Sequence, residues 1–270
     1  MKPKICILRS DGTNCDYELF YAFEKAGGIS EMVHVNQLRN RKKTLASFDI
    51  LALPGGFSYG DDVASGKILA VELISFFKKE LQTFVDKGGI VLGVCNGFQT
   101  LIRTGLLPFN KLGTMQVTLT NNDSGHFECR FVKIKPEKSK AKMFSLLTNI
   151  MDVAVNHGEG KIYTDPETLK KMEDEKLIIF RYVDDNGKPT QDYPQNPNGS
   201  MNAIAGLTDK TGRIIGLMPH PEKFIEITQH PNWRKNKFRK PHGLPFFESI
   251  ISFAKMNKLW KIKKVLLMDK

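Results

Sequence analysis

The chain has 270 residues, of which 41% are hydrophobic and 26% charged, so it can build a substantial apolar core. It contains no apolar run of the roughly 18 residues that a membrane helix needs, and its first residues are typical of a β-strand, not of a signal peptide. The net charge of +11 favours an anionic partner, but no known nucleic-acid-binding module or stacking-type aromatic spacing accompanies it.

The cysteines and histidines give no sign of a metal site. The six histidines form no HExxH motif, and no two cysteines have the CxxC spacing of a zinc site. Without an export signal, the thiols are expected to stay reduced in the cytoplasm. These thiols belong to Cys6, Cys15, Cys95 and Cys129.

Strand and helix signals alternate through the first half of the chain. Apolar runs predict strands over 4–10, 48–54 and 89–94. Helical spacing predicts helices over 17–26, within 67–89 and over 98–102. Strands and helices that alternate with short connections are typical of an open, doubly wound and mostly parallel sheet, with helices on both faces.

The second half changes character, and several of the strands predicted there are expected to be antiparallel. They cover 114–122, 127–136, 176–188 and 213–219. A turn signal, DDNGK, lies within the third of them. A loop rich in proline and asparagine follows over 191–200, and the last helix is predicted over 245–256. No repeat or linker interrupts the chain, so residues 1–270 are expected to form a single α/β domain.

Cys95 lies at a predicted turn between a buried strand and a helix. Its flanking residues Gly93 and Gly97 form a G-x-C-x-G pattern, which is the thiol version of a nucleophile elbow. Small neighbours permit a strained backbone, and the helix N-terminus favours a thiolate. The backbone N–H of Asn96 is placed to stabilise an oxyanion. The alternative is a buried and inert cysteine.

A second motif, H-x-E, follows the strand predicted over 213–219. In an extended segment, His220 and Glu222 would point the same way, so that the carboxylate could orient the imidazole. Together with Cys95 they would form a nucleophile–base–orienter set. A structural histidine at a strand end is the alternative for His220.

A third motif, LPGGFSYGDD, follows the strand predicted over 48–54. Ligands bind at the carboxyl edge of an open α/β sheet, where adjacent glycines expose backbone amides. We expect Gly56 to provide the second oxyanion donor. An ordinary glycine turn is the alternative.

These motifs together resemble the class I, or triad, glutamine amidotransferases. Further motifs resemble the glutaminase-subunit family of phosphoribosylformylglycinamidine synthase, an enzyme of purine biosynthesis. PGGFSYGD and NPNGS are the most specific to that family. The matching segments are GTNCD (12–16), PGGFSYGDD (54–62), GVCNGFQ (93–99), NHGEG (156–160), YPQNPNGSMNAIAG (193–206) and GLMPHPE (216–222).

The resemblance implies a role for each matching position. Cys95 corresponds to the nucleophile, His220 to the general acid and base, and Glu222 to its orienter. Gly56 and Asn96 correspond to the oxyanion-hole amides. Gln99 corresponds to a glutamine-contacting residue, and the substrate pocket closes at Asn156, His157 and Gly158. No firm role follows for Glu159.

The resemblance also implies partners. The ammonia would pass to a separate synthetase subunit, and a small accessory subunit would complete the assembly. This chain has no GxxxxGK[ST] loop, so ATP and magnesium are expected on the synthetase subunit, with no cofactor or metal in this chain.

Other functions remain open at this stage. The chain could serve a different amidotransferase, or be a thiol hydrolase of related fold, although an α/β-hydrolase places its acid before its histidine. It could also be a scaffold without catalysis. The basic segments 233–242 and 261–264 could be a solvated face, a nucleic-acid contact or a docking surface for an acidic partner.

Overall fold

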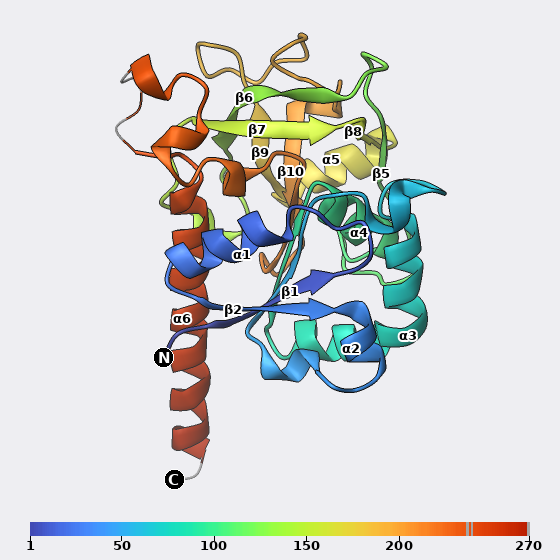
Figure 1. Cartoon of the computed structure of the whole chain (residues 1–270), viewed down its shortest axis with the longest axis vertical. Coiled ribbons are helices and arrows are strands. Elements are labelled where there is room, and N and C mark those ends of the chain that lie inside the picture. Colours follow the sequence, from blue (N-terminus) through green and yellow to red (C-terminus); the bar gives the residue numbers. More distant parts are fainter. Residues whose placement is uncertain (236–237, 239, 269–270) are drawn as a thin grey trace.

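The computed structural model describes residues 1–235, 238 and 240–268, with side chains as far as residue 257. A nine-stranded sheet in the order β2-β1-β3-β4-β11-β10-β9-β6-β7 crosses the molecule (Figure 1). Its first five strands are parallel and the remaining four antiparallel. The predicted α/β class and the change of character between the two halves are therefore confirmed.

The parallel strands are β1 (Lys4–Arg9), β2 (Ile29–His34), β3 (Ile50–Leu53), β4 (Ile90–Val94) and β11 (Ile214–Leu217). β3, β4 and β11 are short and wholly buried, which explains their continuous apolar sequences, whereas the edge strand β2 is mostly half-buried. β1 pairs with both β2 and β3, so the chain changes direction across the sheet there. Ligands bind beyond the carboxyl ends of strands at such a switch point.

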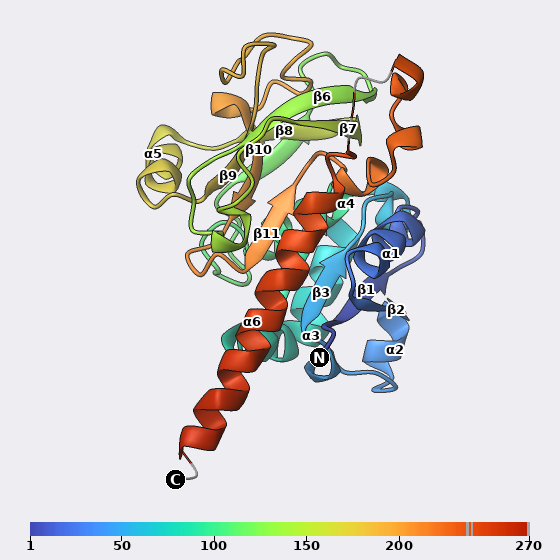
Figure 2. The same cartoon turned by 90° about the vertical axis from the view of Figure 1, so that its left-hand side faces the viewer.

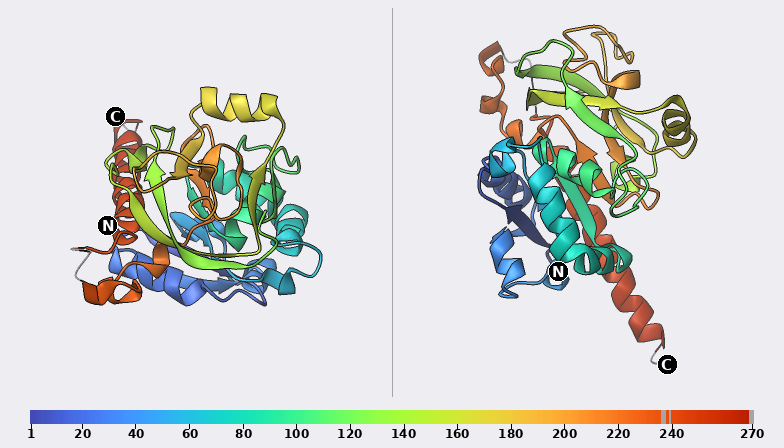
Figure 3. Two further views of the ribbon diagram at one scale, coloured as in Figure 1. Left: turned by 90° about the horizontal axis from the view of Figure 1, so that it is seen from above. Right: turned by 90° about the vertical axis from the view of Figure 1, so that its right-hand side faces the viewer.

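Helices cover both faces of the parallel half, as predicted. α1 (Asp16–Lys25) packs with α6 (Leu244–Met268) on one face, and α3 (Lys67–Asp86) packs with α4 (Asn96–Thr104) on the other (Figure 2). Phe23 of α1 meets Phe247 of α6 edge to face. The short α2 (Val35–Arg39) follows β2. The C-terminal part of α6 extends beyond the rest of the molecule (Figure 3).

The antiparallel half forms a curved extension of the sheet above the carboxyl ends of the parallel strands (Figure 1). It contains β6 (Glu128–Pro136), β7 (Met151–His157), β9 (Ile178–Tyr182) and β10 (Ile204–Thr208). A separate two-stranded sheet pairs β5 (Thr118–Asn121) with β8 (Glu159–Tyr163), and α5 (Pro166–Asp174) follows. This half therefore places a wall beside the tip of β4.

Several boundaries differ from the sequence predictions. The predicted strand over 176–188 is regular only from Ile178 to Tyr182, because a tight turn begins at Asp184 and only one bridge, Val183 to Pro189, continues the pairing. The strands β2, β7, β8 and β10 and the helix α5 were not predicted. The loop over 191–200 has no helix or strand, as expected.

Among the described helices, none is long and apolar enough to cross a membrane. The cytoplasmic location stays a prediction.

Candidate active site

Cys95 lies between the end of β4 and the first residue of α4. Its backbone has φ +50° and ψ −107°, a combination that an L-residue adopts only under constraint. The glycines on either side permit it. A Cβ on Gly97 would lie 2.0 Å from the carbonyl oxygen of Leu53, and one on Gly93 would lie 2.6 Å from that of Gly97. The predicted elbow is therefore present, with β3 and α4 in close contact through it.

His220 and Glu222 form a buried pair at the end of β11. Nδ1 of His220 donates to Oε1 of Glu222 over 2.5 Å, and both side chains are at most 1% exposed. The sequence suggested an extended segment here, but the structure has a single turn of 3-10 helix that begins at Pro221. This turn brings the two side chains together. The backbone N–H of His220 donates to Ala154 of β7. The carboxylate thus selects the tautomer whose Nε2 can accept a proton.

The nucleophile and the base meet around Gly55. If Gly55 carried a Cβ, that atom would lie 2.7 Å from Cε1 of His220 and 3.4 Å from Cβ of Cys95. Nε2 of His220 is buried and has no hydrogen-bond partner in the described part of the chain. The three residues predicted from distant sequence segments therefore come together at one edge of the sheet.

The environment of Cys95 favours the neutral thiol. Burial raises its pKa above the ordinary value, whereas the backbone N–H of Asn96 lowers it. The helix N-terminus was predicted to lower the pKa of this thiol, but burial raises it by more. The thiol therefore needs a neighbouring base to ionise, and His220 is placed to be that base.

Gly56 lines a cavity of about 430 Å³ together with Cys95, the residue that precedes Asn96. Gly56 has φ +136°, and a Cβ there would lie 2.6 Å from the backbone nitrogen of Asn14. Only glycine fits this position. Asn96 begins α4, so its backbone N–H has no acceptor within the helix.

The remaining predicted residues line the same cavity, but several of their polar atoms are already bonded. Gln99 donates through Nε2 to the backbone oxygen of Glu159 over 2.5 Å. The backbone oxygen of Asn156 accepts from the Cys95 thiol over 3.4 Å, and its side chain faces Cys129. Glu159, to which the sequence gave no role, accepts from Arg103. A contact of Gln99 with substrate stays a prediction.

His157 forms a rigid part of the cavity wall. Its Nδ1 lies 3.1 Å from Oδ1 of Asn122, and burial lowers its pKa to about 3. Gly160 and Asn198 pack against its ring, because a Cβ on Gly160 would lie 2.7 Å from His157 and 2.8 Å from Asn198. The loop over 191–200 thus supports the cavity wall from behind.

Cys15 is a site residue that sequence reasoning missed. Its thiol lies 3.5 Å from the position that a Gly55 Cβ would occupy, beside both His220 and Cys95, and burial raises its pKa to about 12. The signal available in the sequence was the GTNCD motif. The ligand-type atoms of Cys15, His220 and Glu222 lie within 4.8 Å of one another. However, the hydrogen bond between His220 and Glu222 makes this a triad geometry, not an open metal site.

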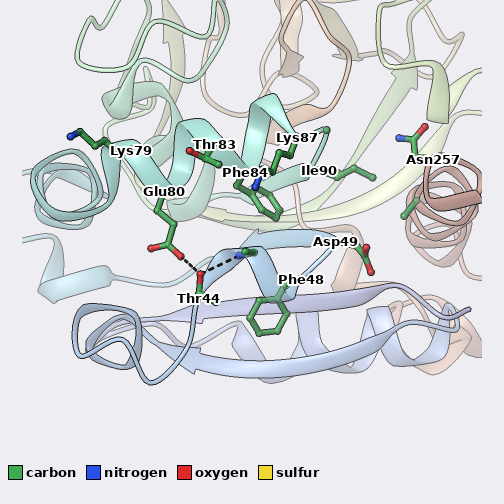
Figure 4. A pocket seen from close by; sticks show the side chains of 14 residues that line it. Thr44, Phe48, Asp49, Lys79, Glu80, Thr83, Phe84, Lys87, Ile90 and Asn257 are labelled. Atoms are coloured by element: carbon green, nitrogen blue, oxygen red, sulfur yellow. Dashed lines mark hydrogen bonds between the residues drawn. The ribbon is translucent and has the colours of Figure 1, made fainter. Parts of the chain in front are cut away.

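A larger cavity of about 550 Å³ lies at the amino ends of β3 and β4, away from the triad. Figure 4 shows it between α3 and the segment before β3, with Glu80 accepting from Thr44. Its lining residues include neither a cysteine nor a histidine. This larger cavity therefore offers neither a thiol nor an imidazole for nucleophilic chemistry.

Comparison with known proteins agrees with this geometry. The CobB/CobQ-like glutamine amidotransferase domain matches residues 2–254. The subunit PurQ of phosphoribosylformylglycinamidine synthase from Dehalococcoides mccartyi is 41% identical over 94% of this chain and 98% of its own. PurQ from Methanococcus maripaludis is 40% identical over 89% of this chain and 90% of its own.

The chain belongs to the glutaminase-subunit family of phosphoribosylformylglycinamidine synthase. A solved structure of PurLQS from Thermotoga maritima matches 94% of this chain and 99% of the matched chain, at 28% identity and a TM-score of 0.70. A putative GMP synthase subunit from Thermoplasma acidophilum is 16% identical with a TM-score of 0.57, and so shares the fold alone.

The basic segments predicted as a docking surface are only partly described. Residues 236, 237 and 239 and the side chains of 261–264 lie outside the described residues. A docking role for these segments in this glutaminase-subunit family member stays a prediction.

The geometry predicts that replacing His220 lowers the rate of glutamine hydrolysis more than replacing Glu222 does. Glu222→Gln keeps the shape of the orienter, whereas His220→Asn removes the base itself. We expect the kcat for glutamine to be at least roughly tenfold higher in Glu222→Gln than in His220→Asn. Steady-state hydrolysis assays measure both. Wild-type activity in Glu222→Gln would remove Glu222 from the triad.

The buried His157 should make the free energy of unfolding depend on pH. Its pKa is lower in the folded state than in the unfolded chain, so the unfolded chain binds more protons below about pH 6.5, and folding weakens as the pH falls. From pH 6.5 to pH 5 the unfolding free energy should lose up to about 1.4 kcal/mol per unit from this group. His157→Gln should flatten this slope in urea titrations. An unchanged slope would show that His157 does not titrate as described.

Proposed function

We propose that the chain hydrolyses glutamine at Cys95 and supplies the ammonia to a synthetase subunit that makes formylglycinamidine ribonucleotide. The observation that carries the proposal is a buried Cys95, His220 and Glu222 set at the carboxyl edge of the sheet, in a chain whose relatives are phosphoribosylformylglycinamidine synthase subunits.

The first half-reaction forms an acyl-enzyme. His220 Nε2 takes the Cys95 proton while Sγ attacks the side-chain amide carbon of glutamine. The carbonyl oxygen becomes an oxyanion, which the backbone N–H groups of Gly56 and Asn96 stabilise. His220 then returns the proton to the nitrogen, the C–N bond breaks, and ammonia leaves a γ-glutamyl thioester.

The second half-reaction regenerates the thiol. A water molecule gives a proton to His220 and attacks the thioester carbon, forming a second oxyanion at the same two amides. The C–S bond breaks, the sulfur takes the proton back, and glutamate leaves. Glu222 keeps Nδ1 of His220 protonated throughout, so Nε2 alone exchanges protons.

The partners follow from the relatives. The solved PurLQS assembly contains a chain similar to this one, which supports a synthetase subunit and a small accessory subunit as partners. ATP and magnesium would bind the synthetase subunit, with this chain needing neither.

Replacing the nucleophile should separate the two activities of the assembly. Cys95→Ala should abolish glutamine-dependent synthesis of the amidine, while added ammonia should still support it, because the synthetase chemistry is untouched. Cys129→Ala, on an exposed thiol, is the matched control and should keep glutamine use. Glutamine hydrolysis by Cys95→Ala would contradict the assignment.

The isolated chain should be a poor glutaminase. Its second oxyanion donor lies in a loop with left-handed residues at Tyr59, Gly60 and Asp61, which a partner contact could set in the active geometry. A population shift of about 3 kcal/mol would change the rate by about 10²-fold. We expect kcat/KM for glutamine to rise by this order when the synthetase subunit, its substrate and nucleotide are added. Full activity in the chain alone would refute the coupling.

A further inference from the structure

The side-chain amide of Asn96 is a buried hydrogen-bond hub beside the nucleophile. Its Oδ1 accepts from the hydroxyl of Ser58 over 2.6 Å and from the Ser58 backbone N–H over 3.3 Å. Its Nδ2 donates to Oδ1 of Asp61 over 2.9 Å and to Oε1 of Gln99 over 3.2 Å. Both lone pairs and both hydrogens of the amide are therefore used.

The partners of Asn96 belong to different walls of the cavity. Ser58 and Asp61 lie in the loop after β3 that carries Gly56. Gln99 lies one turn further along α4 and donates to the backbone oxygen of Glu159, the first residue of β8. One chain of hydrogen bonds thus runs from the Gly56 loop, through the elbow, to the opposite wall.

Backbone hydrogen bonds from Phe57 to Gly12 and from Tyr59 to Asp11 hold one side of the Gly56 loop, and the Asn96 side chain holds the side that faces α4. Tyr59 and Asp61 both have φ +55°, which an L-residue adopts only when its surroundings compensate the strain. On the outer side, Tyr59 bonds to Glu72 of α3. On the inner side, the bonds from Ser58 and Asp61 lead to Asn96, where Ser58 is 2% exposed.

An oxyanion hole works only if its two donors converge on one point, and a misplacement of about 1 Å costs about 10²-fold in rate. Here the two donors, the backbone N–H groups of Gly56 and Asn96, belong to separate segments. The side chain of Asn96 joins them directly, since it is covalently part of one donor residue and hydrogen-bonded to the loop of the other.

We propose that the Asn96 side chain is a positioning residue that sets the two oxyanion donors against each other. Its loss lowers the rate of acyl-enzyme formation and leaves glutamine binding and thiol reactivity largely intact. The inference rests on the proposed function and adds a second role for Asn96 besides its backbone N–H.

The decisive variants alter different sets of the bonds that Asn96 makes. Asn96→Asp keeps the acceptor for Ser58 but loses both donated bonds and sets a carboxylate against Asp61. The exchange variant Asn96→Asp with Asp61→Asn restores a donor–acceptor pair between the two positions and removes the like charges. Ser58→Ala removes one bond only. Thr104→Val, which deletes a buried hydroxyl of α4 away from the cavity, is the matched control.

Two measurements in the complete complex distinguish a loss of oxyanion-donor positioning from a general disruption of the active site. The first is kcat and KM for glutamine. The second is the rate at which iodoacetamide alkylates Cys95, a displacement that forms no oxyanion. We expect Asn96→Asp to lower kcat by about 10²-fold with KM and alkylation within about threefold of wild type. The exchange variant should recover about tenfold, Ser58→Ala should lose about tenfold, and Thr104→Val should match wild type.

The inference is overturned if Asn96→Asp keeps kcat within about threefold, if alkylation falls as far as kcat, or if the exchange variant recovers nothing although it melts with the same cooperativity as wild type. The wild-type complex separates a failure of the proposed function from a failure of the positioning role. If the wild type fails to use glutamine, the proposed function is wrong. If it does use glutamine and Asn96→Asp equals it, only the positioning role is wrong.

Discussion

The left-handed backbone of Cys95 at the end of β4 is the constraint on which the rest of the site depends. It turns the chain from strand to helix within one residue, so that the sulfur faces the cavity while α4 packs back against β3. The contact that enforces it is the close approach of Gly97 to the carbonyl oxygen of Leu53. Because α4 starts directly after the turn, the N–H of its first residue meets the sulfur without further adjustment.

Burial is the second property on which the chemistry of the site depends. The triad, His157 and the Asn96 hub all lie in the interior, where each polar group needs a partner and each charge is costly. The resting site therefore holds a neutral Cys95 thiol, because burial raises its pKa. Preorganised amides are most effective under these conditions, since water cannot screen them.

The antiparallel half of the sheet and the loops attached to it help to enclose the site. β7 positions His220 through a backbone hydrogen bond, and the Asn-rich loop over 191–200 supports His157 from behind. Two exposed rings, Phe57 and Phe127, stack at the mouth of the cavity with their centroids 6.3 Å apart. The triad is thus enclosed by segments that lie far from it in the chain.

Local sequence was enough to predict the α/β class, the strands β1, β3, β4 and β11, and the elbow at Cys95, but not that β11 pairs in parallel with β4. Continuous apolar runs, helical spacing and flanking glycines are properties of neighbouring residues. The pairing of His220 with Glu222 was also predicted from their spacing and from family resemblance, although the local geometry proved to be a 3-10 turn.

Only the tertiary structure decided the rest. β7, β8 and β10 pair with β6, β5 and β9, from which other segments separate them in the chain, so their own residues carry weak signals. The pKa of Cys95 depends on burial that segments from across the chain provide. The same holds for Cys15 beside the triad and for the Asn96 hub, whose partners at Ser58 and Asp61 lie more than 30 positions away. Residue identity alone specifies which groups are available, but their distances and their exclusion from water exist only once the chain has folded.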